Sequence, residues 1–108
     1  MKVIKNVVKL VEQNDLKYQY SYRLIQNIFE NDKIYGIEVE RADFSNESLI
    51  NIERDLIKYI SRDEEKAVKL LDLLADNIVS PIHLVDVLGE YVDRYIENLN
   101  EETVLVYS

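Results

Sequence analysis

The only histidine of the sequence, His83, lies three residues before Asp86, a spacing that places both side chains on one side of a helix. Such a pair could supply two metal ligands, or a general base with a carboxylate partner. On a helical wheel, however, His83 falls in the middle of a polar face beside Glu90 and Arg94. A general base needs a cleft, and two ligands on an exposed helix make a weak metal site. We therefore expect a solvated surface histidine and no bound metal.

Carboxylates are abundant, with 21 Asp and Glu residues, but their pattern does not indicate catalysis. Glycoside hydrolysis needs two carboxylates in one cleft, with one of them desolvated. Glu38 and Glu40 are expected on the outer face of a strand instead. Polar faces of predicted helices carry five others, namely Asp72, Asp76, Asp86, Asp93 and Glu97.

Other catalytic signatures are also missing from the sequence. Gly36 and Gly89 are the only glycines, so no glycine-rich loop can hold a phosphate. No serine stands in a nucleophile elbow, and the lack of cysteine excludes a thiol nucleophile. We predict that the protein is not an enzyme and uses no cofactor.

The composition indicates one small acidic domain spanning residues 1–108. The net charge of −8 and the pI of about 4.6 create a field that repels phosphate backbones, so we expect no direct nucleic-acid binding. Lysines interrupt the apolar residues of the first thirteen positions, unlike in a signal peptide, and no apolar run reaches membrane-spanning length. We expect a soluble cytoplasmic protein that contacts no membrane.

Alternating apolar and polar residues in the first half of the chain predict an antiparallel meander. Strands are expected over residues 2–12, 17–29 and 33–41, with hairpin turns at Asn14-Asp15 and Asn31-Asp32. The resulting cross-strand pairs match in character: Tyr18 with Val11, Tyr22 with Val7, Lys17 with Glu12, Ile28 with Tyr35, Leu24 with Val39, and Arg23 with Glu40. A slip of one residue would exchange the faces and destroy these matches.

Residues 47–60 fit both a strand and a helical stripe, and their isoleucine content favours a fourth strand. Ser61 and Glu64 form a capping box that opens a helix over about 62–76, with Asn77 as a left-handed C-cap. Ser80 and Pro81 predict the start of a second helix over about 81–98. Both helices are amphipathic, which predicts that they lie on the apolar face of the sheet.

The predicted fold class is therefore α+β. An antiparallel meander of three to four strands, over about residues 2–60, is covered on one face by the two C-terminal helices. Residues 103–107 have high strand propensity, and they could add a short C-terminal strand to the edge of this sheet or of a partner.

Three tyrosines, Tyr18, Tyr20 and Tyr22, alternate along the second predicted strand. The register places them on the face that the helices must cover, so we predict packing in the core. The alternative is a ligand pocket between this tyrosine face and the helices. Stacking on nucleic-acid bases is disfavoured by the acidic field around them.

A few apolar residues fall outside the predicted core and suggest an interaction surface. Leu73 and Val87 lie off the apolar stripes of their helices, and Phe29 is expected opposite Ile34 on the outer face of the sheet. The exposed polar residues His83, Asp86 and Glu90 complete this candidate surface. Gly36 lies inside a predicted strand, where glycine usually marks a β-bulge.

The segment "YGIEVE" and the run "ISRDEEKAVKLLDLLADNIVSPIHLVDVLGEYV" resemble a family of short uncharacterised proteins from Firmicutes, chiefly clostridia, catalogued as a domain of unknown function. The resemblance covers roughly residues 18–95. It is carried by Tyr35, Gly36 and Ile37; by Ile60, Ser61 and Asp63; and by Val79, Ser80, Pro81, His83, Leu84, Asp86 and Val87. It implies a bacterial cytoplasmic origin and no known activity. A shared exposed pair of His83 and Asp86 would suggest a role beyond solvation.

These observations predict a small acidic protein that acts through protein contacts in a regulatory or accessory role, as a homodimer or with another protein. The acidic helix faces would steer a basic partner, and an exposed sheet edge or outer face would supply contact area. Two alternatives remain. One is a small-molecule sensor that uses the tyrosine face, and the other is an inhibitor that mimics the charge of nucleic acid.

Overall fold

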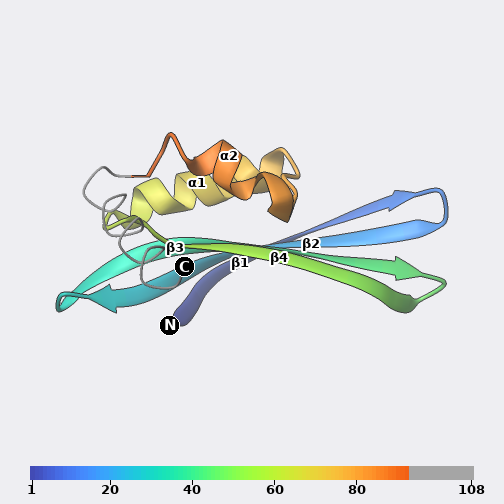
Figure 1. The fold of residues 1–108 in the computed structure, drawn as a ribbon, viewed down its shortest axis with the longest axis horizontal. Helices are drawn as coiled ribbons and strands as arrows, with labels where there is room; N and C mark the ends of the chain where they lie inside the picture. The colour runs from blue at the N-terminus through green and yellow to red at the C-terminus, as the bar shows by residue number, and fades with distance from the viewer. Residues whose placement is uncertain (93–108) are drawn as a thin grey trace, which may run out of the picture.

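A computed structural model describes residues 1–92 of the chain. Its four strands are β1 (Lys2–Gln13), β2 (Leu16–Phe29), β3 (Asp32–Ser45) and β4 (Ser48–Ser61). They form one antiparallel sheet in the order β1-β2-β3-β4, and the helical segments lie over one of its faces (Figure 1). The predicted α+β class and the fourth strand are confirmed. The predicted strand at 103–107 lies outside the described residues.

All three hairpins turn on two residues with positive φ, the geometry of type I′ turns that matches the twist of the flanking strands. The first turn, at Asn14-Asp15, is where the sequence predicts it, and Tyr18 pairs with Val11 as expected. The third turn is at Asn46-Glu47. None of the three turns contains glycine, although glycine is the residue that adopts positive φ most easily.

The second hairpin turns one residue earlier than predicted, which changes its cross-strand register by two residues. It turns at Glu30-Asn31, so Leu24 pairs with Ile37, and the predicted pairing of Leu24 with Val39 is wrong. Arg23 likewise pairs with Glu38 in the ladder, where Glu40 was predicted. Because side chains alternate with a period of two, this shift leaves every residue on its predicted face.

The pairing of β3 with β4 contains a β-bulge beside Gly36. The register shifts between Tyr35 and Ile37, and a Cβ on Gly36 would collide with the carbonyl oxygens of Ile57 and Lys58. The expected bulge at this glycine is therefore confirmed. Gly36 is required here because the backbones of the two strands approach too closely for any side chain.

The first helix, α1 (Glu64–Asp76), lies close to its predicted range but uses different caps. Its N-cap is Asp63, whose side chain accepts a hydrogen bond from the backbone N–H of Lys66, so the predicted capping box from Ser61 is wrong. Ser61 instead accepts from the N–H of Asp63. Asn77 is the C-cap without left-handed geometry, because its φ is −99°, and Ile78 takes positive φ.

The second helical region is much shorter than predicted. Pro81 opens a single 3₁₀ turn, η1 (Pro81–His83), which leads into α2 (Leu84–Leu88). Residues 89–91 form a turn and Val92 lies in a bend, so the prediction of a helix continuing from 81 through these positions is wrong. Residues 93–98 lie outside the described part of the chain. Within residues 1–92, no helix has the length and apolarity needed to cross a membrane.

The core lies between the sheet and the helices. Tyr22, which is 0 % exposed, packs there among Leu24, Ile37 and Val39 of the sheet, and its hydroxyl donates to the carbonyl oxygen of Val79 at 3.0 Å. The helices contribute buried residues to the same cluster, namely Ala67, Leu70, Leu71, Leu74, Ala75, Leu84 and Leu88. Burial raises the pKa of Tyr22 well above its usual range, and the charge of Tyr20 adds to this effect.

Tyr18 and Tyr20 are half-buried, and the Tyr20 ring stacks with that of Tyr22 at 6.3 Å between centroids. None of the three tyrosines is fully exposed, which agrees with the predicted register. The sheet nevertheless extends past the helices at the end that carries the first and third turns (Figure 1). The molecule is 46 Å long, whereas a helix of thirteen residues spans only about 20 Å.

Candidate interaction surface

The sheet has a second face, turned away from the helices, and its side chains line up in four rows across the strands. We call these sixteen residues the outer patch. From the first turn inward, the rows are Glu12, Lys17, Phe44 and Leu49; Leu10, Gln19, Ala42 and Ile52; Val8, Ser21, Glu40 and Arg54; and Asn6, Arg23, Glu38 and Leu56. Each row crosses all four strands, and a register shift of the β3–β4 pairing between Asp43 and Phe44 separates the first row from the second.

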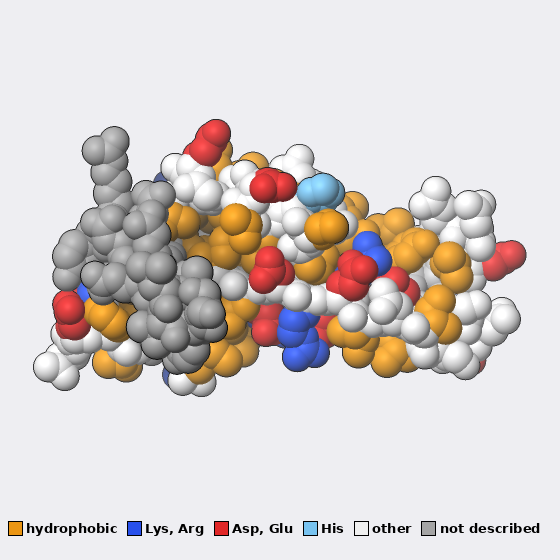
Figure 2. All heavy atoms as spheres, in the orientation of Figure 1, with side chains coloured by type: hydrophobic (Ala, Val, Ile, Leu, Met, Phe, Trp, Pro, Cys, Tyr) orange, Lys and Arg blue, Asp and Glu red, His pale blue; other side chains and the backbone are white. Residues whose placement is uncertain are grey.

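Four large apolar side chains of the outer patch are exposed. Leu10 is 74 % exposed, and Val8, Leu49 and Ile52 are each about half exposed. They stand on the edge strands β1 and β4, while Ser21 and Ala42 between them are small and buried. Figure 2 shows apolar side chains at the surface of the sheet beyond the helices. The exposed residues form two pairs, Val8 with Leu10 on β1 and Leu49 with Ile52 on β4. Exposed apolar side chains gathered on one face of a protein are typical of a contact surface.

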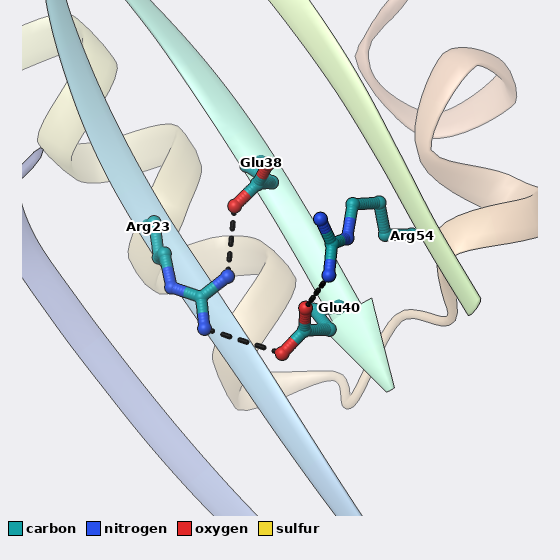
Figure 3. Close-up of polar contacts among 4 residues, drawn as sticks. All are labelled: Arg23, Glu38, Glu40 and Arg54. Carbon is teal, nitrogen blue, oxygen red and sulfur yellow. Dashed lines mark hydrogen bonds and ion pairs between the residues drawn. The ribbon is translucent and has the colours of Figure 1, made fainter. Parts of the chain in front are cut away.

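Charged side chains of the outer patch are paired within the protein. Glu38 accepts from Nη1 of Arg23 at 2.7 Å, and Glu40 accepts from Nη2 of Arg23 at 3.3 Å (Figure 3). The second carboxylate oxygen of Glu40 accepts from Arg54 at 2.6 Å. Burial by itself lowers the pKa of Arg23, but the hydrogen bonds to Glu38 and Glu40 outweigh it and raise the pKa above its ordinary value. Arg23 therefore stays charged.

A second polar network lies on the opposite face, where the sheet extends past the helices. Asp43 is 7 % exposed and accepts two hydrogen bonds from Arg41, at 2.8 and 3.2 Å. Arg41 also pairs with Glu53 at 3.2 Å and lies 5.7 Å from the centre of the Tyr18 ring. The hydrogen bond to Asp43 raises the pKa of Arg41 against the opposing effect of burial. Arg41 is thus already paired with two carboxylates, those of Asp43 and Glu53. We therefore assign this network a structural role in the sheet and not a role in binding.

Residues that the sequence singled out on the helices are spread over the helix layer. His83, Asp86 and Glu90 are exposed, as expected, while Val87 is half-buried and packs against the core. Leu73 is 37 % exposed. Within residues 1–92, no three Asp, Glu or His side chains gather closely enough to hold a metal ion.

The predicted pair of Phe29 and Ile34 does not form. Phe29 pairs with Asp32 in the ladder, and Ile34, opposite Asn27, is fully buried and therefore unavailable to a partner. The Phe29 ring packs against Tyr59 at 5.5 Å between centroids. The lost pairing follows from the change of two residues in the register of the second hairpin, which places Phe29 opposite Asp32.

The sequence analysis missed Val8 and Leu10. Both alternate with Val7 and Val11, which were placed on the helix-covered face, so the register of the first hairpin already directed Val8 and Leu10 outward. The sequence assigned no face to Ile52, because residues 47–60 fit both a strand and a helix; its partner in the ladder is Ala42 on the outer face.

Clefts lined by the described residues are shallow features of the surface. One cleft, of about 590 Å³, lies between the first and third hairpin turns and is lined by polar residues such as Gln13, Asn14 and Asn46. A second, of about 190 Å³, lies where Pro81 and Ile82 approach β4. Neither cleft lies between the tyrosine face and the helices, where the core is packed.

The fold and the outer patch define a small two-layer α+β protein with helices on one face of its sheet and exposed apolar side chains on part of the other face. The model of a family of unknown function, DUF6514, matches residues 1–94, and the chain belongs to this family. The resemblance to a family of unknown function is thereby confirmed. Neither a curated protein nor a solved structure matches the chain.

Proposed function

We propose that this protein is non-enzymatic and acts inside the cell by binding a protein through its outer patch, in a regulatory or accessory role. The observation that carries this proposal is the exposure of four large apolar side chains, Val8, Leu10, Leu49 and Ile52, on one face of the sheet. Covering such side chains stabilises a complex by roughly 1–2 kcal/mol each, since full burial of Leu or Ile is worth about 1.5–3 kcal/mol.

The charges of the outer patch support the same proposal. A partner that covers an unpaired charge must remove its water, which costs several kcal/mol. Glu38, Glu40, Arg23 and Arg54 are already joined by hydrogen bonds of 2.6–3.3 Å, so they can be covered with little further loss. The remaining charges of the patch, Glu12 and Lys17, lie at its margin and are 3.9 Å apart.

Sensing of a small molecule through the tyrosine face has less support. A sensor pocket there would need space between the helices and Tyr22, but Tyr22, Leu24, Ile37 and Val39 are each at most 1 % exposed. The Tyr22 hydroxyl is also engaged by the carbonyl oxygen of Val79. The bacterial, cytoplasmic setting implied by the family resemblance remains part of the proposal, because composition and charge are consistent with it.

Affinity capture with matched variants tests the proposal. Leu10→Lys places a charge in the outer patch, and Ile82→Lys places one on the helix layer at a residue that is also 74 % exposed. Tagged wild-type protein and both variants are compared for the proteins they retain from a lysate, including untagged copies of the chain. We expect Leu10→Lys to lose what the wild type retains, and Ile82→Lys to keep it. Equal capture by both variants would refute a binding role for the outer patch.

A further inference from the structure

We infer that the partner of the outer patch is a second copy of this chain, docked face to face as a symmetric dimer. This inference rests on the proposed function and deepens it. In a dimer of this kind, the same patch is used on both copies, so the patch must be complementary to itself. The charge balance of the outer patch and the arrangement of its rows bear on this condition, and its area sets the strength of the dimer.

Charge separates the two sides of the molecule. Residues 62–92, which contain the helices, carry seven acidic and three basic residues, whereas the outer patch carries three of each. A basic partner would be drawn to the helix layer. Two copies that meet through their neutral outer patches direct both acidic helix layers away from each other, which keeps the repulsion between two chains of charge −8 small.

A two-fold axis between β2 and β3, parallel to the strands, matches the second row and the centre of the fourth row. In the first and third rows the same axis places Leu49 opposite Glu12 and Val8 opposite Arg54. Such an axis places β1 of one copy over β4 of the other, and β2 over β3. In the second row, Leu10 then faces Ile52 of the second copy, so apolar side chains meet on both sides of the axis. In the fourth row, Arg23 faces Glu38 of the second copy, and opposite charges meet.

The geometry is that of aligned sheets packed face to face, which in proteins lie about 10 Å apart with their inner side chains interleaved. The small side chains of Ser21 and Ala42 occupy the middle of the patch, between the large apolar residues of β1 and β4. They leave room at the axis for the longer side chains that face them, because Ala42 lies opposite Gln19 and Ser21 lies opposite Glu40 of the second copy.

The area of the outer patch predicts a weak dimer. Four strands at about 4.8 Å and four rows at about 6.8 Å give roughly 500 Å² on each copy, or about 1,000 Å² in total. Stable protein interfaces begin at about 1,200 Å², so dissociation is expected in the micromolar range. The dimer should therefore appear on concentration and disappear on dilution.

Site-directed cross-linking tests the arrangement, and the lack of cysteine in the natural chain makes it specific. Leu10→Cys and Ile52→Cys chains are prepared separately and treated, alone and mixed, with a short bis-maleimide. The two-fold axis predicts cross-linked dimers in the mixture and none with either variant alone. A mixture of Leu73→Cys and Ile82→Cys chains, both altered on the helix layer, is the matched control and should remain uncross-linked.

Sedimentation velocity over a concentration series supplies the second measurement. The wild type and Ile82→Lys should shift together from monomer to dimer, and Leu10→Lys should remain monomeric, while circular dichroism confirms that each variant is folded. Cross-linking of a single variant with itself, without a gain in the mixture, would overturn the proposed symmetry.

A wild type that stays monomeric at every concentration would overturn the second copy as partner. If Leu10→Lys nevertheless lost its capture of another protein, the proposed function would stand with a different occupant of the outer patch. If Leu10→Lys kept both self-association and capture, the proposed function itself would fail. Capture lost only by Ile82→Lys would indicate a partner on the acidic helix layer and would contradict both.

Discussion

Replacing Gly36 with alanine adds a methyl group where the β4 bulge leaves no room. The new Cβ would collide with the carbonyl oxygens of Ile57 and Lys58 and lie 2.6 Å from the carbonyl carbon of Lys58. All of these atoms belong to the backbone, so no flexible side chain can move aside. Relief requires β3 and β4 to separate at the bulge, where the ladder register shifts.

The expected cost combines two effects. Overpacking of a filled interior costs about 1–3 kcal/mol, and each backbone hydrogen bond lost between β3 and β4 costs about 1 kcal/mol. We therefore expect Gly36→Ala to lower the free energy of unfolding by about 2–4 kcal/mol. For a domain of this size, 1 kcal/mol corresponds to about 4–8 °C in Tm, so the melting temperature should fall by at least roughly 8 °C.

Urea unfolding followed by circular dichroism measures this change, and the other glycine provides the control. Gly89 has a helical φ of −54°, and a Cβ there would meet only the carbonyl oxygen of Val85, at 3.0 Å. Because alanine has the higher helix propensity by about 1 kcal/mol, Gly89→Ala should change stability by less than about 1 kcal/mol. If Gly36→Ala cost no more than Gly89→Ala, the close approach of β3 and β4 would be wrong.

Two further predictions concern the buried tyrosine and the turns. Tyr22→Phe should cost about 1 kcal/mol in urea unfolding, because it removes the hydrogen bond to the carbonyl oxygen of Val79. Burial raises the pKa of Tyr22 above its ordinary value of 10.0. Above about pH 10 the Tyr22 hydroxyl therefore loses its proton in the unfolded chain but keeps it in the folded protein. The free energy of unfolding then falls as pH rises. The Phe variant should show a shallower fall between pH 9 and 11, and an equal slope would argue against the buried hydroxyl. Glu47→Gly should raise the free energy of unfolding by about 1 kcal/mol. Glu47 adopts a φ of 68°, and this left-handed conformation costs a residue with a Cβ about 1–2 kcal/mol. A lower urea midpoint in the variant would contradict this reasoning.

The sequence predicted the first hairpin in full but the second with an error of two residues in its register, for a physical reason. At Asn14-Asp15 the charge pair of Glu12 with Lys17 agrees with only one register. The second turn offers Glu30, Asn31 and Asp32, and both two-residue choices keep every side chain on the same face. Charge could not decide between them, because Arg23 reaches both Glu38 and Glu40 in the folded protein.

The second helix shows where periodicity fails as a guide. Apolar residues continue at helical spacing past Leu88, yet α2 ends there and Tyr91 is 43 % exposed. Periodicity reports which residues would share a face, and it does not report whether a surface lies beneath that face. Gly89, which weakens a helix by about 1 kcal/mol relative to alanine, was the local signal for an early end.

The outer patch was only partly predictable. Alternation along β1 was sufficient to direct Val8 and Leu10 outward, but the sequence alone does not show how much of the sheet the helices cover. The exposure of Leu10 and Ile52 depends on that coverage and on the exact pairing of four strands. The expectation of a contact surface on the outer face arose from Phe29 and Ile34, whereas the exposed apolar residues lie at the other end of the sheet.

The three turns begin at residues 14, 30 and 46, so each strand folds back on the one made just before it after an equal interval. Every strand therefore pairs with a strand that is adjacent in the sequence, and each loop that must close contains only two residues. As the chain leaves the ribosome, hairpins can form in the order of synthesis. The helices are synthesised last and can then pack on a completed sheet face. Because strand pairing here joins sequence neighbours, it avoids the non-local pairing that makes many sheets fold slowly.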